Sequence, residues 1–162
     1  MPRRAKAPPP EFPYSVHKTG GWRGQWLRVR RWHSRLPTAA AQDREDFLYA
    51  FFQSCASFRD WLIHDRPPTL TQQDIETLVK TYVELRLCQD IANATKHFQL
   101  DDPKMHREFS AAREYLPAPV AGGTASSALV ILSTGSKYDA LALANRCVEI
   151  WQTFLILHGL EK

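Results

Sequence analysis

The stretch DREDFLYAFFQSCASFRDWL (residues 43–62) decides the fold class. Acidic residues at its start, Asp43, Glu45 and Asp46, lie where the dipole of a helix N-terminus favours negative charge. Pro67 and Pro68 follow it, and proline ends a helix because it lacks an amide proton and clashes with the preceding turn. Apolar residues recur every three or four positions, which predicts a helix with one buried face: Phe47, Phe51, Cys55, Phe58 and Leu62.

Two more helices are predicted on either side of this segment. From Trp22 to Leu36 the apolar residues keep the helical period, and Pro37 ends the segment. A longer, unbroken helix is predicted to start at Thr69 or Thr71 and to run to Phe98. Its start is indicated by Thr71 and Asp74, which have the spacing of a capping box, in which side-chain and backbone groups bond reciprocally.

A fourth helix is predicted from Ser136 to His158, with Ser136 as its N-cap and Asp139 in its first turn. Because this segment is apolar on two faces, we expect it to be the most central helix of the fold. The apolar, β-branched run at residues 127–133 lies between glycines and is typical of a strand. Residues 114–120 are predicted to pair with it, as an edge strand because they contain prolines.

These elements predict a mainly α fold, an up-and-down helical bundle of about four helices with a small β-hairpin insertion before the last helix. The 162 residues suffice for one domain with a buried core, which we place at residues 21–162. Residues 1–20 are basic and rich in proline, and we expect a mobile tail there. No stretch approaches the ~20 apolar residues of a membrane span, so no membrane association is expected.

The cysteine pattern gives no sign of a metal centre. No two of Cys55, Cys88 and Cys147 have the short spacing of a metal-binding pair, and an odd number does not suggest a disulfide framework. We therefore interpret them as reduced core residues of a cytoplasmic protein and expect neither a metal ion nor another cofactor.

Positive charge is concentrated near the N-terminus, where residues 1–35 hold nine of the 21 basic residues but only one of the 17 acids. Such a segment attracts phosphate backbones, which makes Arg28, Arg30 and Arg31 candidate nucleic-acid-binding residues. An acidic partner, or the acidic remainder of the chain, is the alternative target. Interleaved Trp and Arg residues can also stack on nucleic acid. The helical period of Trp22 and Trp26 instead favours tryptophans that cover the core while the arginines stay solvated.

The predicted long helix changes character along one face. At 3.6 residues per turn, the positions that are apolar at first become polar further on. A solvated face would not continue a buried one in this way, so the polar residues require either an internal network or a ligand. The residues on this face are, in order, Ile75, Val79, Tyr82, Arg86, Asp90, Asn93 and His97.

Two interpretations of this polar stripe compete. In the structural one, Arg86 and Asp90 form an ion pair one turn apart, Asn93 bonds a neighbouring element and His97 favours the helix C-terminus. In the functional one, the stripe opens into a cleft or a dimer seam. His97 is then a general acid or base, Arg86 and Lys96 bind a phosphate oxygen, and Asn93 orients His97 or the substrate.

The sequence Asp90-Ile-Ala-Asn93-Ala-Thr-Lys96-His97, late in a long helix, resembles the HEPN superfamily (higher eukaryotes and prokaryotes nucleotide-binding). The preceding Phe58-Arg-Asp60-Trp61 is similar to a segment of uncharacterised bacterial proteins that carry such a motif. The family motif is an arginine followed a few residues later by a histidine. In this chain Asp90 stands at the place of the arginine, and Arg86 lies one turn earlier.

The resemblance implies a helical bundle, a homodimer and RNA as the partner. In active members it implies metal-independent RNA cleavage, often in toxins or phage defence. The candidate catalytic residues are then His97, Arg86, Asn93 and Asp90, with Lys96 and the three arginines named above binding nucleic acid. The alternative is a non-catalytic interaction module or a subunit of a larger complex, in which the stripe is a buried structural network.

Overall fold

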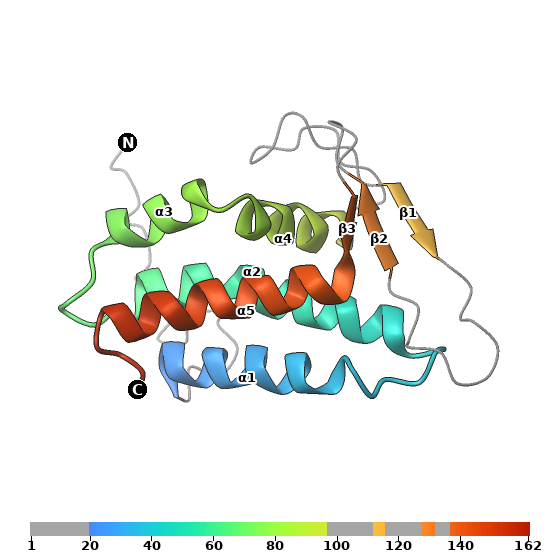
Figure 1. Cartoon of the computed structure of the whole chain (residues 1–162). Helices are drawn as coiled ribbons and strands as arrows, with labels where there is room; N and C mark the ends of the chain where they lie inside the picture. Colours follow the sequence, from blue (N-terminus) through green and yellow to red (C-terminus); the bar gives the residue numbers. More distant parts are fainter. Residues whose placement is uncertain (1–19, 97–111, 116–127, 132–136) are drawn as a thin grey trace, which may run out of the picture.

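The computed structural model describes residues 20–96, 112–115, 128–131 and 137–162. Within these ranges the chain forms five helices and three short strands (Figure 1). The helices are α1 (Gly21–Arg35), α2 (Arg44–His64), α3 (Gln72–Thr81), α4 (Val83–Ala94) and α5 (Ala140–Leu157). The strands are β1 (Ala112–Tyr115), β2 (Ala128–Ile131) and β3 (Lys137–Asp139), which form an antiparallel sheet in the order β1–β2–β3. The predicted mainly α bundle with a small β insertion is confirmed.

The core is built around α2, which packs along α1 and α4 and also contacts α3 and α5. Its predicted apolar stripe faces inward, and Phe51 and Phe58 are fully buried. Phe58 contacts Trp26 of α1 and Trp151 of α5, with ring centroids 5.2 Å and 4.9 Å away. Helix α2 has the more extensive contacts with the other helices, whereas α5, which we expected to be the most central, has the larger share of buried residues, nine of 18 against seven of 21.

Helix α1 matches the predicted segment closely and ends before Pro37. Trp22 and Trp26 are each 4% exposed, and Val29 is fully buried. The tryptophans therefore cover the core, and the arginines between them face solvent. This confirms the interpretation that the helical period favoured.

The predicted long helix is wrong in one respect, because Tyr82 interrupts it. Tyr82 has extended backbone angles, with φ −98° and ψ 117°, and it separates α3 from α4. The guanidinium of Arg86 donates a hydrogen bond to the carbonyl oxygen of Lys80, 2.5 Å away, and so satisfies a group that the break leaves without a helical partner. The ring of Tyr82 packs against the core, with the Arg146 guanidinium 5.9 Å from its centroid. The capping box of Thr71 and Asp74 is confirmed at the start of α3.

The last helix begins later than predicted, at Ala140 instead of Ser136. Residues 137–139 pair with β2 as strand β3, which leaves Asp139 as the N-cap. Its carboxylate accepts a hydrogen bond from the amide of Ala142 at 2.8 Å. The sheet lies at one end of the bundle, next to the start of α5 (Figure 1). By length and apolar composition α5 could cross a membrane, but half of it is buried within the bundle, as in the core helix of a folded domain.

Candidate functional site

The polar stripe is divided by the break between α3 and α4. Arg86 and Asp90 lie one turn apart on α4, and Asn93 lies near its end. Asp90 is only 1% exposed and Arg86 is partly buried, whereas Asn93 and Lys96 are exposed. His97, the candidate proton-transfer residue, lies outside the described residues. The structure therefore places two stripe residues inside the bundle and two candidate ligand-binding residues at its surface.

The interior part of the stripe does not form the expected ion pair. Among the described residues no salt bridge joins Arg86 to Asp90, because the guanidinium of Arg86 is directed to the Lys80 carbonyl. The Nε atom of Arg86 and the Oδ2 atom of Asp90 are both buried without a hydrogen-bond partner in the described part of the chain. Burial raises the pKa of the Asp90 carboxyl to about 6, and the positive charge of Arg86 limits that rise. Asp90 is thus a group of the interior and does not contact solvent.

The end of α4 is fixed to α2 by a polar contact. The side-chain amide of Gln53 donates to the hydroxyl of Thr95 at 2.8 Å, and that hydroxyl donates to the carbonyl of Ala92 at 2.8 Å. Thr95 lies between Asn93 and Lys96 in the sequence. The contact therefore holds this short exposed segment next to Gln53.

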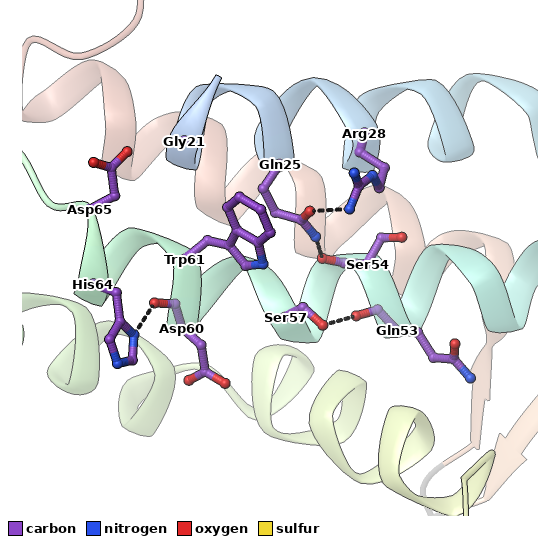
Figure 2. Close-up of a pocket in the computed structure, with 10 residues that line it drawn as sticks. All are labelled: Gly21, Gln25, Arg28, Gln53, Ser54, Ser57, Asp60, Trp61, His64 and Asp65. Atoms are coloured by element: carbon purple, nitrogen blue, oxygen red, sulfur yellow. Dashed lines mark hydrogen bonds between the residues drawn. The ribbon is translucent and has the colours of Figure 1, made fainter. Parts of the chain in front are cut away.

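Gln53 is also part of a groove on the outer face of the bundle, with a volume of about 830 Å³. Helix α1 forms one side of the groove and α2 forms its floor (Figure 2). Most of its lining residues carry polar groups and one is an indole, but most of the surface that they present is apolar. The residues from α1 are Gly21, Gln25 and Arg28, and those from α2 and its end are Gln53, Ser54, Ser57, Asp60, Trp61, His64 and Asp65.

One buried amide organises the α1 side of this groove. Gln25 is only 2% exposed, and its Nε2 atom donates to the carbonyl oxygen of Ser54 at 2.8 Å. Its Oε1 atom accepts a hydrogen bond from Nη1 of Arg28 at 2.9 Å. Gln25 therefore ties α1 to α2 and holds the guanidinium of Arg28 at the groove (Figure 2).

The indole of Trp61 stands between α1 and α2 in the middle of the groove (Figure 2). It is partly exposed, unlike the tryptophans of the core. His64 lies one turn further along α2, and its Nδ1 is 2.7 Å from the carbonyl oxygen of Asp60. A nitrogen in this position leaves Nε2 as the atom that can bond a ligand. The groove thus combines an aromatic face with hydrogen-bond donors and hydrogen-bond acceptors.

The far end of the groove is closed by a contact between the two helices. The amide of Trp22 donates to Oδ2 of Asp65 at 3.0 Å, so a carboxylate from the end of α2 occupies the N-terminus of α1. Gly21 has φ 52°, and a Cβ atom built on it would lie 1.9 Å from the same oxygen. Glycine is required here both for its backbone angle and for the space that Asp65 takes.

Arginines extend the polar surface along α1, which contains no acidic residue. Arg30 pairs with Glu161 at 2.9 Å, and half of its side chain remains exposed. Arg31 is exposed and has no ion pair within the described ranges. All three predicted nucleic-acid-binding residues lie on α1 with the exposed Arg23 and Arg35, and Arg28 is the one of them that lines the groove.

Of the ten groove-lining residues only Arg28 was a predicted site residue, and for two of the others, Trp61 and Gln25, the sequence contains a signal. Trp61 lies next to the buried stripe of α2 but off it, and a large aromatic residue in that position is a sign of a binding surface. Gln25 lies on the apolar face of α1, between Trp22 and Val29, where a polar side chain needs an internal partner.

No protein-family model, no curated protein and no solved structure matches this chain.

Proposed function

We propose that this chain binds single-stranded RNA along α1 and α2, with a base in the groove against Trp61 and the sugar-phosphate backbone on the α1 arginines. The observation that carries the proposal is that an acid-free, arginine-rich helix forms one side of a groove that contains Arg28 and a partly exposed indole. Proteins that bind single strands combine a positive track for the phosphates with aromatic side chains on which bases stack.

The charges within the groove are compatible with this ligand. Asp60 is paired with Arg59 at 2.9 Å, and Asp65 is engaged by the amide at the start of α1. These contacts offset much of the repulsion that the two carboxylates would exert on a phosphate. Arg28 remains at the groove with its guanidinium oriented by Gln25, which favours a hydrogen bond to a phosphate oxygen.

The contact between Gln53 and Thr95 gives the proposed strand a path beyond the groove. It places the segment that contains Asn93 and Lys96 next to one end of the groove. A strand that leaves the groove at Gln53 would reach Lys96, the residue that the family resemblance assigns to phosphate binding. The HEPN resemblance supports RNA as the nucleic acid. In this proposal Arg86 and Asp90 have a structural role and do not contact the RNA.

The arginine face is tested by the salt dependence of binding. The double variant Arg28→Ala/Arg31→Ala is expected to weaken binding of a fluorescent single-stranded RNA, because two phosphate contacts are lost. The slope of log K against log[salt] should fall by about 0.7 for each lost contact. Fluorescence anisotropy between low and physiological salt measures both quantities.

The matched control is Lys80→Ala/Lys162→Ala, which removes the same charge from exposed positions outside the groove. It is expected to leave the salt slope within error of the wild type. Equal losses of affinity in the two double variants would mean that net charge alone attracts RNA, and would refute the proposal that RNA binds along α1.

Cleavage is a separate prediction, which rests on the family resemblance and on His97. If the chain is a metal-independent ribonuclease, His97→Ala should abolish cleavage of a labelled RNA in the presence of a chelator. General acid–base catalysis contributes roughly 10²- to 10⁴-fold, and the melting temperature and RNA affinity should change little. A wild-type protein that binds RNA and leaves it intact, with and without metal, refutes cleavage and supports a role in binding alone.

A further inference from the structure

The three cysteines, far apart in the sequence, meet in the centre of the bundle. Cys55 comes from α2, Cys88 from α4 and Cys147 from α5, and none is more than 1% exposed. Their three sulfur atoms all lie within 4.8 Å of one another. The prediction that they are reduced core residues is confirmed, since all three are free thiols. Their convergence, however, was not visible in the sequence spacing.

Two of the thiols have backbone acceptors. The sulfur of Cys88 is 3.6 Å from the carbonyl oxygen of Phe52, and that of Cys147 is 3.5 Å from the carbonyl oxygen of Glu84. These protons must leave when the sulfur atoms bind a metal ion, because the thiolate is the ligand. The cluster presents three soft donor atoms around one point. Within the described ranges no His, Asp or Glu joins the group.

We propose that Cys55, Cys88 and Cys147 bind one Cu(I) ion in a three-coordinate, all-sulfur site. Soft sulfur ligands select Cu(I), Zn²⁺ and iron–sulfur clusters. Structural Zn²⁺ sites are almost always tetrahedral and need a fourth ligand, and the part of the chain that the structure describes offers none to this group. A single soft ion with three ligands is the better match to the donor set.

The spacing of the sulfur atoms is suitable for such an ion. A point equidistant from three atoms no more than 4.8 Å apart lies within about 2.8 Å of each of them. Metal–sulfur bonds are about 2.3 Å long, so each sulfur needs to move by only about 0.5 Å. A change of this size is within the reach of cysteine rotamer adjustments and requires no rearrangement of the helices.

Metal binding requires the thiolate form of cysteine, so each thiol that coordinates the ion releases its proton to solvent. Copper remains Cu(I) throughout, so binding consumes no oxidant or reductant.

The test uses the full chain, reduced with a thiol-free phosphine under anaerobic conditions and titrated with Cu(I) in competition with a colorimetric Cu(I) chelator. We expect one ion per chain and a rise in melting temperature of about 5–10 °C at saturating copper, since a ligand that binds only the folded state stabilises it. Because the sulfurs are buried, loading should be faster when the protein refolds with Cu(I) than when native protein is mixed with it.

The variant Cys88→Ser is expected to lose at least 100-fold in Cu(I) affinity and to lose the rise in melting temperature. The matched control is Val148→Ala, which removes buried packing from α5 but keeps all three sulfurs, and should bind copper as the wild type does. Equal copper affinity in Cys88→Ser and wild type overturns the proposal, as does a wild type that retains no copper.

A measurement on the wild type alone keeps the proposal testable where a cysteine variant does not fold. X-ray absorption of the copper-loaded protein should show a shell of three sulfur atoms and no nitrogen or oxygen ligand. A nitrogen or oxygen shell refutes the site. A parallel titration with Zn²⁺ should give weaker binding, and tighter binding of Zn²⁺ than of Cu(I) refutes the choice of ion.

Discussion

Replacement of Trp61 by alanine is expected to weaken binding of single-stranded RNA by about 5- to 150-fold, because a base loses its stacking partner. Stacking of a base on an aromatic side chain contributes about 1–3 kcal/mol by alanine substitution. The groove lining contains one other aromatic ring, the smaller imidazole of His64, so most of the stacking surface is lost with Trp61. Anisotropy titrations with a short unstructured RNA measure the loss directly. Because the loss is in stacking and not in charge, the salt slope should be unchanged.

Two further variants separate stacking from a general effect on the fold. Trp61→Phe keeps an aromatic face and should retain most of the affinity. Tyr82→Ala removes an aromatic ring that packs against the core and does not line the groove. It should lower the melting temperature and leave RNA affinity intact. A Trp61→Ala variant that binds RNA as tightly as the wild type means that no base enters the groove.

The second large effect concerns Asp90. Its pKa is about 6 in the folded protein and 3.8 in the unfolded reference, so the folded state holds the proton more tightly between these values. Stability is therefore highest below pH 4 with respect to this group and falls as the pH rises toward 6. Above that pH the ionised, buried carboxyl costs on the order of 2–3 kcal/mol, because one pKa unit corresponds to about 1.4 kcal/mol.

Asp90→Asn is accordingly expected to raise the free energy of unfolding at pH 7.5 by roughly 1–3 kcal/mol, since it removes the buried negative charge. It should also flatten the dependence of stability on pH between about 4 and 6. Urea denaturation at four or five pH values measures both effects. Asp46→Asn is the control, because Asp46 is an exposed carboxylate. Its replacement should leave the fall in stability between about pH 4 and 6 unchanged. A destabilised Asp90→Asn protein at pH 7.5 would show that the ionised carboxyl has a favourable partner.

Much of the fold was predictable because it depends on local periodicity. The stripe of α2 needs no tertiary information, since spacing alone determines which side chains share a face. The capping box at Thr71 is equally local. The break at Tyr82 was not predictable in this way, because no proline or glycine marks it. It depends on the contact of Arg86 with the Lys80 carbonyl and on the packing of Tyr82 against other helices.

The candidate site likewise has parts that the sequence shows directly and parts that depend on tertiary contacts. Arg28, Arg30 and Arg31 were identified from charge, which a sequence shows directly. The groove was not, because it exists only where α1 lies against α2 and where Gln25 bonds the Ser54 carbonyl. The cysteine cluster likewise depends on three helices that meet in space. Spacing rules find metal ligands that are close in sequence, and these are not.

The contact between Asp65 and the start of α1 has a consequence for the shape of the groove. The two helices approach closely at this end because residue 21 has no side chain, and a single methyl group there would collide with the carboxylate. A methyl group at residue 21 would therefore displace the Asp65 carboxylate from the amide of Trp22. The start of α1 would lose its bond to the end of α2, and this end of the groove would be less firmly closed.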